Sequence, residues 1–126
     1  MPMEEVTMIL LYEVDKLPGW PALQAAIAMK KETYRLVQLD EYQLTLGQLA
    51  AGEKAGPSLP ANPLPQPMMV LCGLQGPDLS SFLDLARKLG APSIALKAML
   101  TDTNQAWTTL QLYHELQAEH AFFQKH

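Results

Sequence analysis

The sequence has a single cysteine, Cys72, and few basic residues. One cysteine cannot form an intrachain disulfide, which is typical of proteins from a reducing compartment. Lys and Arg number 9 against 13 Asp and Glu, so the net charge is −4, and the basic residues form no continuous stripe. Because nucleic acids and anionic membranes attract basic surfaces, we expect neither a nucleic-acid partner nor a membrane partner.

Long hydrophobic runs are also absent. The longest, Met8–Tyr12, is far shorter than the roughly 20 apolar residues of a transmembrane helix. Residues 1–5 lack the basic segment that begins a signal peptide, so we expect a cytoplasmic protein. Hydrophobic residues make up 48% of the chain and charged residues 17%, which is typical of a globular protein. This length predicts one domain over residues 1–126, with a core that needs neither disulfides nor metal.

Four short apolar segments are typical of strands, and the segments between them have helical spacing. The strands are predicted at residues 6–12, 34–39, 68–72 and 93–97. Helices are predicted after Pro21, within residues 42–51, over 77–90 and from about 103 to 124. In the last helix, residues at steps of three and four predict an apolar face made of Ala106, Leu110, Tyr113, Leu116, His120 and Phe123.

The alternation of strands and helices predicts an α/β fold. We expect a small three-layer domain in which helices flank a four-stranded, mainly parallel sheet of order 2-1-3-4. An antiparallel or ferredoxin-like arrangement is the alternative. Residues 52–67 contain five of the ten prolines and form the most irregular part of the chain. We interpret them as an extended surface excursion, and a lid or a polyproline ligand for a partner is the alternative.

In an open parallel sheet, ligands bind beyond the carboxyl ends of the strands. Residues 15–20, 40–42, 72–76 and 97–107 follow the four predicted strands, and we expect them to meet at this edge. Lys97 can present a point charge to an anion there, beside the start of the last helix. The candidate ligand-binding residues are Lys97, Thr101, Asp102, Thr103, Asn104, Trp107, Asp15, Cys72 and Gly73.

Each of these residues also has an ordinary structural interpretation. The Thr101–Asn104 stretch has typical helix-capping chemistry, and Trp107 stands where a core aromatic residue is expected. Cys72 ends a buried strand, where a lone cysteine usually packs as a small hydrophobic residue. Gly73 begins a strand-to-helix turn that lacks the lysine and hydroxyl of a phosphate-binding P-loop. We therefore assign no catalytic residue.

Metal binding is also not supported by the histidines. His114, His120 and His126 stand six residues apart, which on a helix turns successive side chains by about 120°. Zinc-binding helices instead place two histidines four residues apart on one side. Asp15 and the pair formed by Asp40 and Glu41 can hold a divalent cation or can be solvated acids at strand ends. We assign no metal ligand.

The chain resembles a family of short bacterial proteins catalogued only as a domain of unknown function. The points of likeness are Leu10–Tyr12, Met69–Gly73 and, most specifically, Leu96–Asn104 followed by Trp107 and Leu112–Leu116. The likeness covers most of the chain outside the proline-rich segment. It implies a shared fold and carries no activity and no cofactor.

A weaker likeness links the chain to receiver domains of two-component signalling, which also place acids after the first strand and a lysine late in the sheet. The third predicted strand ends in Cys72 and Gly73, where a receiver domain has its phosphorylated aspartate. Phosphoryl transfer by that route is therefore not supported.

The sequence leaves the function unknown and favours a non-catalytic binding or regulatory module. In that hypothesis the strand-end edge holds a small anionic ligand. The alternative is a protein-interaction subunit, including a homodimer, that acts through the last helix or the proline-rich segment. A small enzyme is the third hypothesis. The sequence indicates no particular cofactor.

Overall fold

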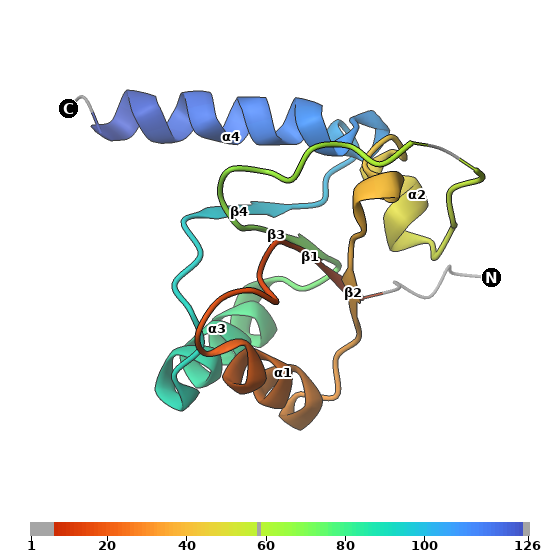
Figure 1. Cartoon of the computed structure of the whole chain (residues 1–126). Helices are drawn as coiled ribbons and strands as arrows, with labels where there is room; N and C mark the ends of the chain where they lie inside the picture. Colours follow the sequence, from red (N-terminus) through yellow and green to blue (C-terminus); the bar gives the residue numbers. More distant parts are fainter. Residues whose placement is uncertain (1–6, 58, 125–126) are drawn as a thin grey trace.

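The computed structural model describes the backbone of residues 7–57 and 59–124, and the side chains as far as residue 119. Helices and strands alternate along the chain (Figure 1). In order, the elements are β1 Met8–Tyr12, α1 Trp20–Met29, β2 Tyr34–Leu36, the 3₁₀ turn η1 Leu39–Glu41, α2 Leu46–Ala50, β3 Met68–Cys72, α3 Gly76–Leu89, β4 Leu96–Met99, the 3₁₀ turn η2 Asn104–Ala106, and α4 Thr109–Gln124. No helix in this described part of the chain has the length and apolar character needed to cross a membrane.

The four strands form one sheet in the order β2-β1-β3-β4, which confirms the predicted α/β fold and strand order. β1 is parallel to β2, and β3 is parallel to β4. The central pair, β1 and β3, is antiparallel, with Leu10 opposite Val70 at its middle. The carboxyl ends of β1 and β2 therefore lie at one edge of the sheet, and those of β3 and β4 lie at the opposite edge.

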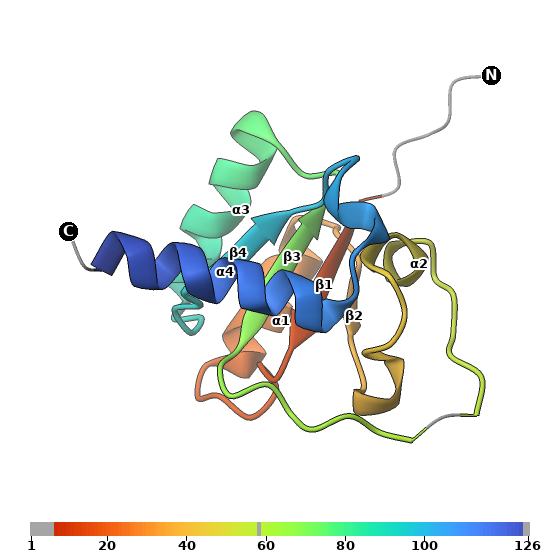
Figure 2. The ribbon, with the colours of Figure 1, turned by 90° about the horizontal axis from the view of Figure 1, so that it is seen from above.

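This geometry corrects one expectation, that the segments after all four strands meet at a single edge. The reason is the path of the proline-rich segment, residues 52–67. It runs along the outside of the molecule and returns the chain to the edge where β1 ends (Figure 2). Along the way it is fixed by a hydrogen bond from the Ala61 amide to the Leu39 carbonyl, 3.0 Å long, and by the buried Leu64 side chain. Residues 53–57 and 59–67 form no helix or strand.

Helices cover both faces of the sheet, so the molecule has three layers (Figure 1). Alternate side chains of each strand point to opposite faces. Ile9 and Leu11 pack with α1 and α3 on one face. Leu10 and Tyr12 pack with α2 and α4 on the other. The continuous apolar runs of β1 and β3 are thus explained, because both faces of these central strands are buried.

The last helix begins later than the sequence predicts, and its predicted apolar face is confirmed at Tyr113 and at the partly buried Leu116 but not throughout. Trp107 is extended, with φ −84° and ψ 149°, so the expected helix divides into the short turn η2 and α4. Over residues 109–119 of α4, the buried side chains are Thr109, Leu112 and Tyr113, whereas Leu110 is 45% exposed. Thr109 fixes the helix to the sheet by donating a buried hydrogen bond to the Tyr12 hydroxyl, 3.0 Å away. The predicted face was wrong at Leu110 and at the exposed Ala106, and the side chains of His120 and Phe123 lie outside the described residues.

Two stretches of the chain repeat the same arrangement. The first unit, residues 8–50, and the second unit, residues 68–124, each run strand, helix, parallel strand, 3₁₀ turn and helix. The antiparallel pairing of β1 with β3 relates them by an approximate twofold axis through the Leu10 and Val70 pair. Matching backbone contacts follow this symmetry. The Val37 amide bonds to the Leu11 carbonyl at 2.9 Å, and the Leu100 amide bonds to the Leu71 carbonyl at 3.0 Å.

The helices that end the two units begin with the same capping motif. Thr45 and Gln48 form a reciprocal capping box at the start of α2, in which each side chain accepts a hydrogen bond from the other residue's amide. Thr108 and Gln111 do the same at the start of α4. Thr45 and Thr108 also form an isolated antiparallel bridge. The two caps thus meet at the centre of the helical layer.

We expect Thr45→Ala and Thr108→Ala each to lower the free energy of unfolding by about 1 kcal/mol, because each leaves backbone amides of a helix start without an acceptor. Urea unfolding followed by circular dichroism measures the loss. Thr103→Ala is the matched control, since its exposed side chain caps no element. Equal stability of all three variants would contradict the capping roles.

Candidate functional site

A cavity of about 360 Å³ lies between α3, the loop that follows it and the start of β4. Its floor consists of buried side chains from the face of the sheet that α1 and α3 cover. Polar side chains stand on its α3 and β4 sides. The lining residues are Leu23, Met69, Phe82, Leu83, Ala86, Arg87, Ala91, Pro92, Ser93, Ile94 and Lys97.

The loop after α3 shapes one wall of this cavity. α3 ends at Gly90, whose left-handed φ of 93° turns the chain away from the helix axis, and the Ala91 amide then bonds to the Ala86 carbonyl at 2.9 Å. The turn before α1 lies directly against this loop. A Cβ atom at Gly19 would stand 2.6 Å from the Gly90 carbonyl oxygen, so only glycine permits the close approach. The loop that forms this wall is therefore fixed by contacts with α3 and with the turn before α1.

Two cationic side chains, Lys97 and Arg87, line the cavity. Lys97 is the second residue of β4, opposite Met69, and its ammonium donates a hydrogen bond to the Ile94 carbonyl at 2.5 Å. Arg87 comes from the last turns of α3, and one guanidinium nitrogen lies 2.8 Å from an Asp84 carboxylate oxygen. Arg87 has further N–H donors besides the one that faces Asp84. The cavity thus combines an apolar floor with two positive groups.

The matching position in the first unit is filled differently. Tyr34 stands opposite Ile9 at the start of β2, as Lys97 stands opposite Met69 in β4. The Tyr34 ring packs edge-on against Trp20 with centroids 5.6 Å apart, and its hydroxyl accepts a hydrogen bond from Gln24 at 3.1 Å. Both contacts are with α1. An aromatic side chain packed on the helix thus stands where the second unit has a cation that lines a cavity.

Several other candidate residues lie at the carboxyl end of β4, at the opposite edge of the sheet. The side chains of Thr101 and Asn104 accept hydrogen bonds from each other's amides, at 3.0 and 2.8 Å, and the Asn104 amide group donates to the Met99 carbonyl. Asp102 and Thr103 are exposed beside them. Trp107 packs partly buried against the core. Thr101 and Asn104 thus close a turn after β4, whereas the cap of the last helix is Thr108 rather than this stretch.

The remaining candidates fall into two places. Cys72 and Gly73 end β3 at the edge where β4 also ends, and Gly73 has a φ of 83° that suits its turn. Asp15 lies at the other edge, where it lines a hollow of about 170 Å³ together with Glu13, Lys16 and residues 36–39. Of the nine candidate residues, the structure places only Lys97 in the large cavity.

Cys72 has no chemical activation. It is 1% exposed, and burial raises the pKa of its thiol to about 12. We expect iodoacetamide to leave the native protein unmodified at neutral pH and to alkylate Cys72 once urea unfolds the chain, because the thiolate is the reactive form. Mass spectrometry of the intact protein across a urea series measures this. Rapid alkylation without urea would contradict the buried, neutral thiol.

Glu13 is a polar residue that the sequence does not single out. It follows β1 with a left-handed φ of 62°, which is uncommon for a residue other than glycine. Its carboxylate accepts hydrogen bonds from Lys16 at 2.8 Å and from the Tyr42 hydroxyl at 2.7 Å. Burial raises the pKa of Glu13, but these two bonds outweigh it, so the pKa is lower than usual. The contacts compensate the strained backbone and tie β1 to the segment after η1.

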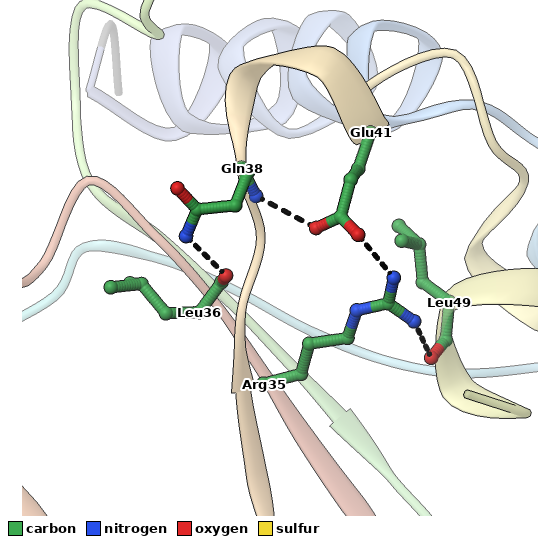
Figure 3. Close-up of polar contacts among 5 residues, drawn as sticks. All are labelled: Arg35, Leu36, Gln38, Glu41 and Leu49. Atoms are coloured by element: carbon green, nitrogen blue, oxygen red, sulfur yellow. Dashed lines mark hydrogen bonds and ion pairs between the residues drawn. The ribbon is translucent and has the colours of Figure 1, made fainter. Parts of the chain in front are cut away.

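An ion pair joins β2 to the elements that follow it (Figure 3). The Arg35 guanidinium donates to the Glu41 carboxylate at 2.5 Å and to the Leu49 carbonyl at 3.0 Å. The other oxygen of Glu41 accepts from the Gln38 amide at 3.0 Å. Burial raises the pKa of Glu41, but the hydrogen bonds from Gln38 and Arg35 lower this pKa by a larger amount. The pKa of Glu41 is therefore below its usual value. This cluster connects β2, η1 and α2 and is structural.

Of the acids that the sequence offers for a cation, Glu41 is already engaged. Glu41 is paired with Arg35, and Asp15 lines the hollow beside Glu13. Over the residues that the structure describes, no three His, Cys, Asp or Glu side chains are grouped so that they could hold a metal ion.

Arg87 is the cavity residue that sequence reasoning missed. Its position in the last turn of a helix, near Lys88, is explained by the helix dipole alone. It lines the same cavity as Lys97 because α3 packs beside β4. No local pattern in the sequence signals that shared lining.

Comparison with known families supports the resemblance described above. Residues 67–123 match a family described as a domain of unknown function (DUF3783). No curated protein matches the chain, and no solved structure does. The matched range holds every residue that lines the cavity except Leu23, and it excludes Leu10–Tyr12. The second unit of this chain is thus similar to an uncharacterised family, and that similarity assigns no activity.

Proposed function

We propose that the protein is a non-catalytic binding module that holds a small anionic ligand in the cavity beside Lys97. The observation that carries this proposal is the convergence of Lys97 and Arg87 on a cavity whose other residues are mostly apolar. Binding sites for small molecules typically have this composition, an apolar lining with a few polar groups that orient the ligand.

Charge supports an anionic rather than a cationic ligand. The chain carries a net charge of −4, yet among the described residues the charged side chains that line this cavity are the two cations. Each of the two cations interacts only weakly with its partner in the protein. Arg87 pairs with Asp84 on the surface, and such exposed pairs contribute at most about 1 kcal/mol. Lys97 donates to a neutral carbonyl. An anion can therefore bind without breaking a strong interaction.

The lining residues favour binding over catalysis. Among the described residues the lining offers the Ser93 hydroxyl and the Lys97 amine but no carboxylate, histidine or thiol, so the most common general bases are missing beside them. Cys72 ends β3 at the edge away from the start of β4, and its thiol stays protonated.

A thermal-shift screen of the full chain against small carboxylates, phosphate esters and sulfonates tests the proposal. A ligand at a hundred times its Kd adds about 2.7 kcal/mol of stability, enough to raise Tm by several degrees. We expect Lys97→Ala and Arg87→Ala to remove this shift. Lys88→Ala is the matched control, because Lys88 is an exposed cation on α3 outside the cavity. A shift that survives both substitutions, or no shift with any anion, would overturn the proposal.

A second candidate function is a protein-interaction subunit. Leu59 in the proline-rich segment is 91% exposed and Leu110 on α4 is 45% exposed, and both line a hollow of about 300 Å³ beside Tyr42. Two exposed leucines on one hollow favour an apolar partner surface. Light scattering of the full chain at high concentration tests for a homodimer, which Leu59→Ser should weaken. A concentration-independent monomer mass would count against self-association.

A further inference from the structure

We infer that the ligand of this cavity is an amphipathic carboxylate, whose acid group meets Lys97 and Arg87 and whose aliphatic or aryl body fills the apolar floor. This inference rests on the proposed function and narrows it to one chemical class. Three properties of the cavity carry it, namely the composition of the walls, the local charge and the volume.

Most of the cavity lining is apolar, and its floor is continuous with the core. Eight of the eleven lining residues are apolar. Leu23, Met69 and Phe82 are each at most 3% exposed and belong to the core on this face of the sheet. A sugar, a nucleoside or another polyhydroxylated body would bury polar groups here without partners, which is unfavourable. A hydrocarbon body has no polar group that would be buried without a partner.

The local charge matches a monoanion. Lys97 and Arg87 contribute two positive charges, and the Asp84 carboxylate beside Arg87 cancels one of them. A carboxylate balances the remaining charge, whereas a phosphate monoester carries nearly two negative charges at neutral pH. The planar guanidinium also presents paired N–H donors that fit the two oxygens of a carboxylate. Ser93, on the loop wall, adds a hydroxyl to this polar side.

The volume sets the size of the body. If each non-hydrogen atom of a ligand takes up about the 30 Å³ of a water molecule, a cavity of about 360 Å³ holds roughly a dozen. Octanoate, decanoate and phenylpropanoate have about this size. Burial of one methylene group improves binding about fourfold, so affinity should rise with chain length until the cavity is full.

Calorimetric titration of the full chain with butanoate, hexanoate, octanoate, decanoate and dodecanoate tests the inference. We expect Kd to fall about fourfold for each added methylene up to octanoate or decanoate and to change little beyond. Octylamine and octanol have the same body without the negative charge, and they should bind at least tenfold more weakly than octanoate. Chemical-shift changes in NMR spectra should be largest at the cavity residues, such as Leu83, Ala86 and Ile94.

Variants separate the two parts of the site. Lys97→Ala should weaken octanoate at least tenfold and leave the dependence on chain length intact. Leu83→Ser should instead reduce the dependence on chain length, because Leu83 is a partly buried part of the wall. Leu79→Ser is its matched control. Leu79 is also a partly buried leucine of α3 that packs on the same core, but it does not line the cavity. The control should bind octanoate as the unmodified protein does.

The outcomes distinguish this inference from the proposed function. Tighter binding of octyl phosphate or inorganic phosphate than of octanoate, lost in Lys97→Ala, would keep the anion site and overturn the carboxylate. Equal binding of octylamine, octanol and octanoate would overturn both, because the charges would then play no role. Failure of every anion to bind at millimolar concentration would also overturn both.

Discussion

Replacement of Phe82 by alanine is expected to lower the free energy of unfolding by about 3–5 kcal/mol. Phe82 is fully buried on α3, where it packs with α1 and the sheet. Its ring also forms part of the floor of the cavity beside Lys97. Removal of the ring would join a new void to an existing one, so the surrounding side chains have little opportunity to close the gap. Urea unfolding followed by circular dichroism measures the loss.

Leu83→Ala is the control for this prediction. Leu83 is the next residue of α3 and lines the same cavity, but it is only partly buried. We expect it to cost distinctly less than Phe82→Ala, because less apolar surface returns to water. A loss below about 1 kcal/mol for Phe82→Ala would show that this face of the sheet is not packed as described.

The second large effect is expected at the ion pair between Arg35 and Glu41. Each side chain is 15% exposed, so both charges are largely removed from water. Arg35→Ala leaves the Glu41 carboxylate and the Leu49 carbonyl without this donor. Loss of one partner of a fully buried pair costs about 3–5 kcal/mol, and the residual exposure here reduces our expectation to about 2–3 kcal/mol. Urea unfolding of Arg35→Ala beside the unmodified chain measures the loss.

Lys16→Ala is the matched control for Arg35→Ala. Lys16 also donates to a glutamate, but its own side chain is 65% exposed. We expect loss of this exposed cation to cost distinctly less stability than loss of Arg35. Equal losses in the two variants would show that burial of the Arg35 pair has no energetic consequence.

Acid should destabilise the protein through the same carboxylates. The pKa values of Glu41 and Glu13 are lowered in the folded chain by their hydrogen bonds, despite the opposing effect of burial. A lowered folded pKa means that the unfolded chain binds protons first as pH falls. Their contribution to stability is therefore complete at neutral pH, declines as pH drops below about 5, and is lost below the folded pKa values. Glu41→Gln should make the free energy of unfolding fall less steeply as pH drops. An unchanged slope would exclude Glu41 as a source of the acid destabilisation.

The two-unit architecture explains why a family match to the second unit alone is compatible with one continuous sheet. β3 pairs with β4 inside the second unit and with β1 of the first. The first unit therefore covers a strand edge that the second unit by itself would leave unpaired, and unpaired edges promote association. The two units differ at equivalent positions. The Lys97 position lines a cavity, and the equivalent Tyr34 position is packed against α1.

Local sequence patterns determined most of the elements of this protein. The apolar run Met68–Cys72 is a strand with these bounds, and α3 ends before Gly90 because glycine adopts the left-handed conformation that stops a helix. Leu46, Leu49 and Ala50 form the buried face of a short helix as their spacing predicts. These features depend on neighbours in the chain. The sequence predicts Lys97 at the carboxyl end of its strand, whereas it is the second residue of β4 and lines the cavity beside the start of that strand.

The direction of β3 relative to β1 was decided only by the tertiary structure. An apolar run is buried equally well in either direction, so it carries no signal that distinguishes a parallel from an antiparallel neighbour. That one choice separates Asp15 from Cys72 and Gly73, and it defines where the two units meet. The cavity itself depends on how α3 and its loop pack beside β4. This packing makes Arg87 line one cavity with residues distant in the sequence, such as Leu23 and Met69. Contacts of this kind arise from packing between elements, and no single segment of the sequence encodes them.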